Sequence, residues 1–181
     1  YGRKKAIAVG RLENQKGFDM LIDCWKRVAE QHPDWHLDIY GVGSLHDKLQ
    51  EQIDQLRLND YITLCGCSNN IMDVYPEYSL HIMSSRYEGQ PMTLIEAQAC
   101  GLPSVVFNFK FGAADIVQNG VNGIIVEQND CKAFSEALCK MMSSEDMRKK
   151  YGQNALEVGR QYFKNNVFSK WIELLEFISK A

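Results

Sequence analysis

Several features that would place a chain in a special class of protein are scarce or missing from this sequence of 181 residues. No apolar run approaches the roughly 18 residues that a membrane-spanning helix requires. Basic residues are not in excess, because 20 Lys and Arg stand against 23 Asp and Glu, which gives a net charge of -3. A chain without a global basic field is not expected to bind nucleic acid.

Paired cysteines and metal-binding motifs are also missing. The six cysteines include no C-x-x-C pair and no zinc-binding spacing, and Cys65-Gly-Cys67 is spaced too closely for either. We therefore expect free, mostly buried thiols and a cytoplasmic location, where thiols stay reduced. The sequence contains no D-x-D motif either. We expect no cofactor and no divalent metal that bridges phosphates.

What the sequence does contain is a regular alternation of strand and helix patterns. Short apolar runs typical of buried strands occupy residues 6–9, 37–40, 62–64, 80–83, 104–107 and 123–126. Helical patterns occupy residues 18–29, 45–56, 71–75, 93–100, 113–117, 131–142, 145–162 and 166–179. This order predicts one α/β domain over residues 1–181, with a Rossmann-like parallel sheet of about six strands, helices on both faces and a helical C-terminal tail.

Glu88 and Glu96 are the most informative pair of residues. They lie eight positions apart in the segment EGQPMTLIE, which turns through Gly89 and Pro91 and then becomes helical. The pair therefore flanks a helix N-terminus, where free N–H groups and the helix dipole favour anions such as phosphate. Carboxylates beside a phosphate are suited to accept hydrogen bonds from sugar hydroxyls. Other interpretations are a general acid and base, or an exposed loop acid and a first-turn helix acid.

Arg11 and Lys16 follow the first predicted strand. Both are expected at the carboxyl edge of the sheet, where ligands of such folds bind. Arg offers a planar fork and Lys a compact charge, so the two could neutralise a diphosphate and stabilise it as a leaving group. Gly41-Val-Gly43 follows the second strand but lacks the third glycine of a dinucleotide fingerprint. A tight turn explains these glycines as well as ligand contact does.

In these segments the chain resembles the C-terminal, donor-binding domain of the family 4 retaining glycosyltransferases, which have the two-domain GT-B fold. The resemblance covers nearly the whole chain and rests on residues 10–12 (GRL), 16–17 (KG), 40–43 (YGVG), 85–97 (SRYEGQPMTLIEA), 99–103 (ACGLP) and 119–123 (NGVNG). It implies one half of a GT-B enzyme, whose N-terminal acceptor domain is absent from this chain. The abrupt start at Tyr1 likewise indicates a domain cut from a longer protein.

The resemblance implies a hexosyltransferase of polysaccharide biosynthesis. Its donor is a nucleoside diphosphate hexose, with UDP the usual nucleotide, and its acceptor is a glycan or a lipid-linked sugar. Arg11 and Lys16 are implied to hold the diphosphate, while Glu88 faces the hexose hydroxyls and Glu96 the ribose hydroxyls. Arg11, Lys16 and Glu88 are the implied catalytic residues. The other implied donor contacts are Gly41, Gly66, Cys67, Gly89, Gln90, Pro91, Met92, Thr93 and Leu94.

One residue of this chain departs from the family pattern, and one catalytic residue of the family has no counterpart here. Gln90 stands where many relatives carry a bulky apolar residue after the Glu-Gly pair. The family's catalytic histidine belongs to the absent domain, and none of the four histidines fits that role: His32, His36, His46 and His81. His81 lies within an apolar strand and is expected in the core.

Two alternatives to a transferase domain remain open. One is a nucleotide-sugar epimerase of the same fold, and the other is a non-catalytic nucleotide-binding or interaction module. The second depends on the last helix, whose apolar stripe either packs on this domain or awaits a partner: Trp171, Ile172, Leu175 and Ile178. The basic run 148–150 is expected on a solvated helix face, with contact to an anionic membrane at its inner face as the alternative.

Overall fold

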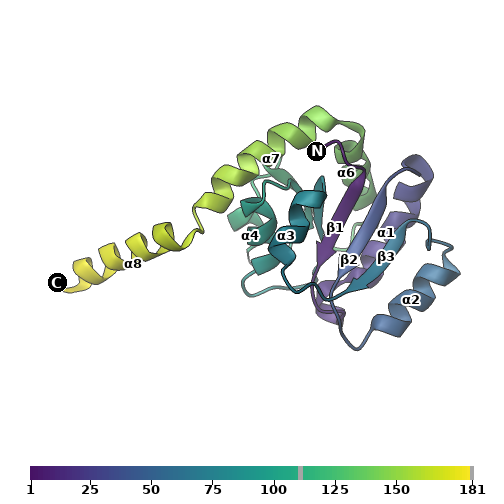
Figure 1. The fold of residues 1–181 in the computed structure, drawn as a ribbon, viewed down its shortest axis with the longest axis horizontal. Helices are drawn as coiled ribbons and strands as arrows, with labels where there is room; N and C mark the ends of the chain where they lie inside the picture. The colour runs from purple at the N-terminus through teal and green to yellow at the C-terminus, as the bar shows by residue number, and fades with distance from the viewer. Residues whose placement is uncertain (110–111, 180–181) are drawn as a thin grey trace.

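The computed structural model describes residues 1–109 and 112–179 of the chain. Within this part, six parallel strands form one sheet in the order β3-β2-β1-β4-β5-β6. Figure 1 labels three of them side by side, β1, β2 and β3. The strands are β1 (Lys5–Val9), β2 (His36–Tyr40), β3 (Ile62–Gly66), β4 (Leu80–Met83), β5 (Ser104–Phe107) and β6 (Gly123–Val126). The predicted six-stranded parallel sheet is therefore confirmed.

The helices also follow the predicted order, and their bounds lie within two residues of the predicted ones. They are α1 (Phe18–Gln31), α2 (His46–Gln55), α3 (Ile71–Val74), α4 (Met92–Ala99), α5 (Ala113–Ile116), α6 (Cys131–Ser143), α7 (Glu145–Arg160) and α8 (Lys164–Ser179). Two short 3-10 helices, η1 (Asn14–Lys16) and η2 (Tyr75–Glu77), were not predicted. A single turn leaves no periodic pattern in a sequence.

The two faces of the sheet are covered by different helices. On one face α1 packs against α2 and α6, and Trp25 joins strand residues such as Ala8 in the larger core cluster. On the other face α4 packs against α7, and Leu94 lies in a second cluster with Met83. Ile7 contributes to a third cluster on this second side. Successive β1 residues thus face opposite layers, as the period of a strand requires.

Arg148 corrects the expectation for the basic run 148–150. Its side chain is buried, and its guanidinium donates to the carbonyl oxygens of Met141 and Met142, each at 2.8 Å, and to that of Tyr1. Carbonyl groups in the last turn of α6 have no donor within the helix, so the guanidinium satisfies them. The prediction of a solvated face is wrong for Arg148, while the other two residues of the run are exposed.

Helix α8 extends away from the body of the domain (Figure 1), and its apolar stripe is exposed. Trp171 is 58% exposed and Leu175 60% exposed. Of the two alternatives for this stripe, packing on this domain is therefore not observed. No helix in the described part of the chain is both long and apolar enough to cross a membrane.

Candidate functional site

Two loops meet at the carboxyl edge of the sheet, one after β1 and one after β4. The Arg86 N–H donates to the carbonyl oxygen of Gln15 at 2.8 Å, and Ser84 Oγ donates to that of Lys16 at 2.9 Å. Gly17 has φ 62°, and a Cβ there would lie 2.2 Å from the Ser84 carbonyl oxygen. Only glycine permits this approach, so Gly17 brings the two loops into contact.

Lys16 and Glu88 form a direct ion pair between these loops. Lys16 Nζ lies 2.6 Å from Glu88 Oε1, and the two side chains are only 13% and 5% exposed. Ser85 Oγ donates to the same carboxylate oxygen at 2.6 Å. The Lys16 stem packs against Gly10, where a Cβ would lie 2.8 Å from Lys16 Cε. The structure therefore brings two of the three predicted catalytic residues together.

Gln15 extends this ion pair to Arg11. Its Nε2 donates to the Tyr87 carbonyl oxygen at 3.0 Å and to Glu88 Oε2 at 3.4 Å. Arg11, which is exposed, donates to Gln15 Oε1 at 3.4 Å. We call Arg11, Gln15, Lys16, Ser85 and Glu88 the edge network. It places two cations and one carboxylate at the edge of the sheet where ligands of parallel α/β folds bind.

A cleft of about 210 Å³ opens beside the edge network, at the carboxyl ends of β1, β2 and β3. Arg11, Tyr40, Gly41 and Cys67 are among the residues that line it. A Cβ at Gly41 would lie 1.8 Å from the Gly10 carbonyl oxygen, so this glycine is required by the packing of the loop. The close approach explains Gly41 without a ligand, although Gly41 also lines the cleft.

Gly66 lies beside the cleft but is not among the residues that line it. It has φ 70°, and its carbonyl oxygen accepts a hydrogen bond from the Gly41 N–H at 2.8 Å. Gly66 therefore holds Gly41, the first glycine of the turn after β2. Gly66 is also the residue directly before Cys67, which lines the cleft.

Helix α4 begins at Met92, directly after the β4 loop. Glu96 is therefore its fifth residue, and the interpretation of Glu96 as a first-turn acid is wrong. The hydroxyl of Tyr75 lies 3.2 Å from Glu96 Oε2 and 3.2 Å from the Thr93 carbonyl oxygen. Burial and the Glu96 carboxylate raise the pKa of Tyr75, which keeps it a donor.

The remaining predicted contacts lie between the two glutamates. Gly89, Gln90 and Met92 are exposed, and Pro91 and Leu94 are buried. Thr93 Oγ1 is buried, and no described residue pairs with it.

The other histidine and cysteine predictions have mixed outcomes. His81 is fully buried, as predicted, and burial with nearby Lys16 lowers its pKa to about 3. Its Nδ1 lies 3.2 Å from Ser104 Oγ, while Nε2 has no partner among the described residues. All six cysteines are free, but only Cys24 and Cys139 are buried, so the prediction of mostly buried thiols is wrong. Within the described ranges, no three His, Cys, Asp or Glu side chains are grouped to hold a metal ion.

Three residues of the site were not predicted from the sequence: Gln15, Ser85 and Tyr75. All three are neutral, so they give no charge signal. The spacing did contain a hint for two of them, because Gln15 lies four positions after Arg11 and Ser85 three before Glu88. Tyr75 reaches Glu96 across 21 positions of sequence, which no local pattern indicates.

A parallel α/β domain with cations and a carboxylate beside a cleft at its carboxyl edge has the arrangement of a nucleotide-binding domain. The family profile described as "Glycosyl transferases group 1" matches residues 2–158. The chain belongs to this family.

Relatives agree with this assignment. The amylovoran biosynthesis glycosyltransferase AmsD of Erwinia amylovora is 34% identical over 173 residues, which are 96% of this chain and 48% of that protein. The structure of S. aureus TarM in a complex that includes UDP has a TM-score of 0.90 at 25% identity, over 95% of this chain and 35% of that one. The structure of the GtfA/B complex has a TM-score of 0.88 at 30% identity, over 98% of this chain and 36% of that one.

The chain spans about half the length of AmsD and about a third of the two solved chains. The predicted fold is confirmed, and the prediction of a glycosyltransferase is confirmed at the level of the family.

Proposed function

We propose that this chain is the donor-binding domain of a retaining glycosyltransferase. The enzyme moves a hexose from a UDP-sugar to an acceptor glycan or lipid-linked saccharide. The edge network carries the proposal, because it sets cations and a carboxylate beside a cleft at the carboxyl edge. Similarity to TarM, solved with UDP, and to a protein named for amylovoran biosynthesis supports the donor and the acceptor class.

Arg11 is the cation most available to the donor diphosphate. It is exposed, and its hydrogen bond within the edge network is a long one, 3.4 Å to a neutral amide oxygen. A guanidinium can bind two phosphate oxygens at once. Negative charge grows on the diphosphate as its bond to the sugar breaks, so Arg11 also stabilises the leaving group.

Lys16 has a double role in this proposal. Its ammonium neutralises Glu88, which would otherwise repel an anionic donor. An ammonium has three N–H donors, so one remains for a phosphate oxygen while another holds Glu88. Among the described residues, Glu88 Oε2 makes only the 3.4 Å contact with Gln15, so it keeps acceptor capacity for a hexose hydroxyl.

The other predicted contacts complete the donor site. We assign Glu96 to the ribose hydroxyls, and Gly41, Gly66 and Cys67 to the base. Residues 89–94, from Gly89 to the first turn of α4, are assigned to the sugar and phosphate. The two cations supply the positive charge that a metal gives other transferases, so donor binding is expected to survive EDTA.

The rest of the enzyme is proposed to lie outside this chain. AmsD is about twice as long as the matched region, which leaves room for an acceptor domain with the catalytic base. The exposed stripe of α8 is proposed to pack on that domain. We also propose that the enzyme works in the cytoplasm, at the inner face of the membrane. The isolated chain should bind donor but transfer sugar very slowly, and transfer at the rate of a full-length relative would contradict this.

Calorimetry with UDP tests the proposal directly. Arg11→Ala should weaken UDP binding by about tenfold, equivalent to about 1.4 kcal/mol. The matched control is Arg27→Ala, which removes an exposed arginine from the middle of α1 and should leave the affinity unchanged. Glu96→Ala should weaken UDP but not inorganic pyrophosphate. A chain that binds no nucleotide would favour the interaction module, which the exposed α8 stripe also allows.

A further inference from the structure

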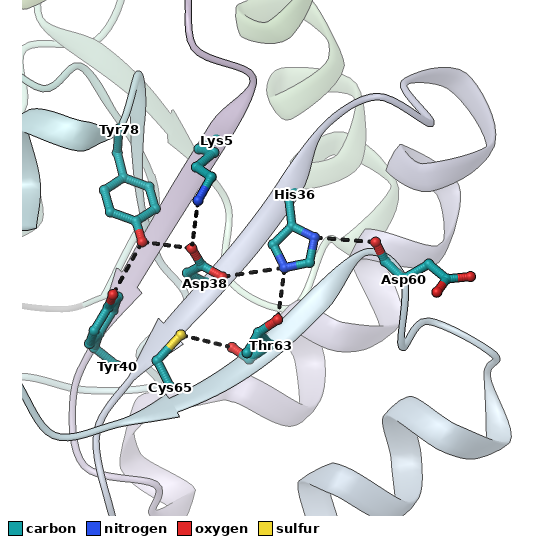
Figure 2. Close-up of polar contacts among 8 residues, drawn as sticks. All are labelled: Lys5, His36, Asp38, Tyr40, Asp60, Thr63, Cys65 and Tyr78. Carbon is teal, nitrogen blue, oxygen red and sulfur yellow. Dashed lines mark hydrogen bonds and ion pairs between the residues drawn. The ribbon is translucent and has the colours of Figure 1, made fainter.

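Tyr40 lines the cleft, and groups outside the cleft hold its orientation. It ends β2, and its side chain lines the cleft with Val9, Cys67 and other residues. Its ring meets that of Tyr78 edge to face, with centroids 6.4 Å apart and planes at 88°. Figure 2 shows the two hydroxyl groups pointing toward each other on one face of the sheet.

Tyr78 is in turn anchored by a carboxylate. Its hydroxyl lies 2.6 Å from Asp38 Oδ2 and 3.4 Å from the Tyr40 hydroxyl. A phenol has one proton, and a carboxylate is the stronger acceptor. Tyr78 therefore donates to Asp38, and Tyr40 donates to Tyr78. Burial and the hydrogen bond to Asp38 raise the pKa of Tyr78, which keeps it protonated.

Asp38 is held between His36 of its own strand, β2, and Lys5 of the neighbouring strand β1. His36 Nε2 lies 3.3 Å from its Oδ1, and Lys5 Nζ lies 3.7 Å from its Oδ2. Burial alone would raise the pKa of Asp38, but hydrogen bonds from His36 and Tyr78 outweigh burial and lower it. A line of contacts thus runs along the sheet from the Asp38 carboxylate through Tyr78 to Tyr40 (Figure 2), and Tyr40 lines the cleft.

We propose that Tyr40 is the surface on which the aromatic base of the donor nucleotide stacks, and that Tyr78 and Asp38 are positioning residues that hold its ring for this contact. The inference rests on the proposed function, which places a nucleotide in the cleft. It assigns a base contact to the Tyr40 side chain, whereas the resemblance implied donor contacts only at neighbouring residues such as Gly41 and Cys67.

The composition of the cleft supports this assignment. Arg11 lines the same cleft and would hold the phosphates, so the base lies toward the other lining residues, which include Tyr40, Val9 and Ile71. A planar aromatic ring is the best contact among them for a planar base. Ordering a free side chain costs affinity when a ligand binds. The hydrogen bond to Tyr78 removes part of that cost, because the Tyr40 ring is oriented before the nucleotide arrives.

Calorimetry of the 181-residue chain with UDP and with inorganic pyrophosphate separates base contacts from phosphate contacts. Tyr40→Leu should weaken UDP by about tenfold and leave pyrophosphate unchanged. Tyr78→Phe keeps the ring but removes the hydroxyl, and should weaken UDP by about threefold. In a Tyr40→Leu background, Tyr78→Phe should have no further effect. Additive losses, or an equal loss of pyrophosphate affinity, would assign Tyr78 a merely structural role and overturn its positioning role.

A measurement on the unaltered chain covers the case in which a variant fails to fold. Nuclear Overhauser contacts between the Tyr40 ring protons and the uracil protons of bound UDP are expected, and their absence would overturn the stacking. If folded Tyr40→Leu bound UDP within twofold of the original affinity, the stacking would also be overturned, but the proposed function would stand. Failure of the unaltered chain to bind UDP would contradict both the proposed function and the stacking on Tyr40.

Discussion

Replacing Lys16 by methionine removes the ammonium but keeps most of the side-chain volume. The change leaves the Glu88 carboxylate, which is 5% exposed, without the cation that lies 2.6 Å away. Exposed ion pairs are worth about 0.2–1 kcal/mol, whereas removing one partner of a buried pair costs about 3–5 kcal/mol. Lys16 is 13% exposed and lies at the edge of the sheet, so we expect the lower end of the second range, about 3 kcal/mol.

Urea unfolding at pH 7, followed by circular dichroism, measures this loss. A destabilisation of about 3 kcal/mol corresponds to a fall in Tm of about 6–12 °C for a chain of this length. The double variant Lys16→Met with Glu88→Gln removes both charges and should be less destabilised than Lys16→Met alone. Lys149→Met is the matched control, because Lys149 pairs with Glu145 at 2.8 Å on the exposed face of α7. It should leave the midpoint unchanged.

Two results would refute this reasoning. One is a loss below about 1 kcal/mol in Lys16→Met, which is the behaviour of an exposed pair. The other is additivity, in which the double variant loses as much as the two single variants together. Either result would mean that Lys16 and Glu88 are separately solvated, and the proposed neutralisation of Glu88 by Lys16 would then have no basis.

Three further predictions concern the frame around the site. Gly41→Ala should cost about 3 kcal/mol in the same urea assay, because its Cβ would lie 1.8 Å from the Gly10 carbonyl oxygen; a loss below about 1 kcal/mol would mean that the loop yields easily. Arg148→Met should lower the unfolding free energy by about 3 kcal/mol, because buried carbonyl groups lose their donor, and an unchanged midpoint would contradict that role. Stability should fall as pH rises above about 6.5, because Asp38 raises the pKa of His36 in the folded chain and the unfolded chain releases that proton first. Midpoints measured from about pH 6 to 8, below the range in which thiols titrate, should show this slope, and His36→Gln should remove it.

The elements of the fold could be predicted because each buried parallel strand is a continuous apolar run. The surroundings of each helix face were harder to predict, because periodicity shows which residues share a face but not what that face contacts. Arg148 was expected in solvent and is buried, because unpaired carbonyl groups of α6 lie above it. Trp171 was expected either on the domain or against a partner, and its 58% exposure shows that the domain does not cover it.

The charged members of the candidate site could be predicted as residues, but not their pairing. From charge and the family resemblance, Arg11 and Lys16 were assigned to the diphosphate of a donor and Glu88 to its hexose. The structure instead joins them through Gln15 and a direct ion pair, across a separation of 72 positions between Lys16 and Glu88. That pairing depends on the close approach at Gly17, which is a property of two loops together.

The two glutamates that motivated the donor-site interpretation turn out to have different surroundings, and this bears on their roles. Glu88 Oε1 accepts from a cation and a hydroxyl, both at 2.6 Å, so its charge is compensated before any ligand arrives. Glu96 lies in the second turn of α4 and, among the described residues, accepts only a neutral phenol hydrogen bond, at 3.2 Å, from Tyr75. A general acid and base pair needs two carboxyl groups whose pKa values are pushed apart. Here one carboxylate belongs to an ion pair and the other to the frame of α4, which favours two separate hydroxyl contacts along one extended donor.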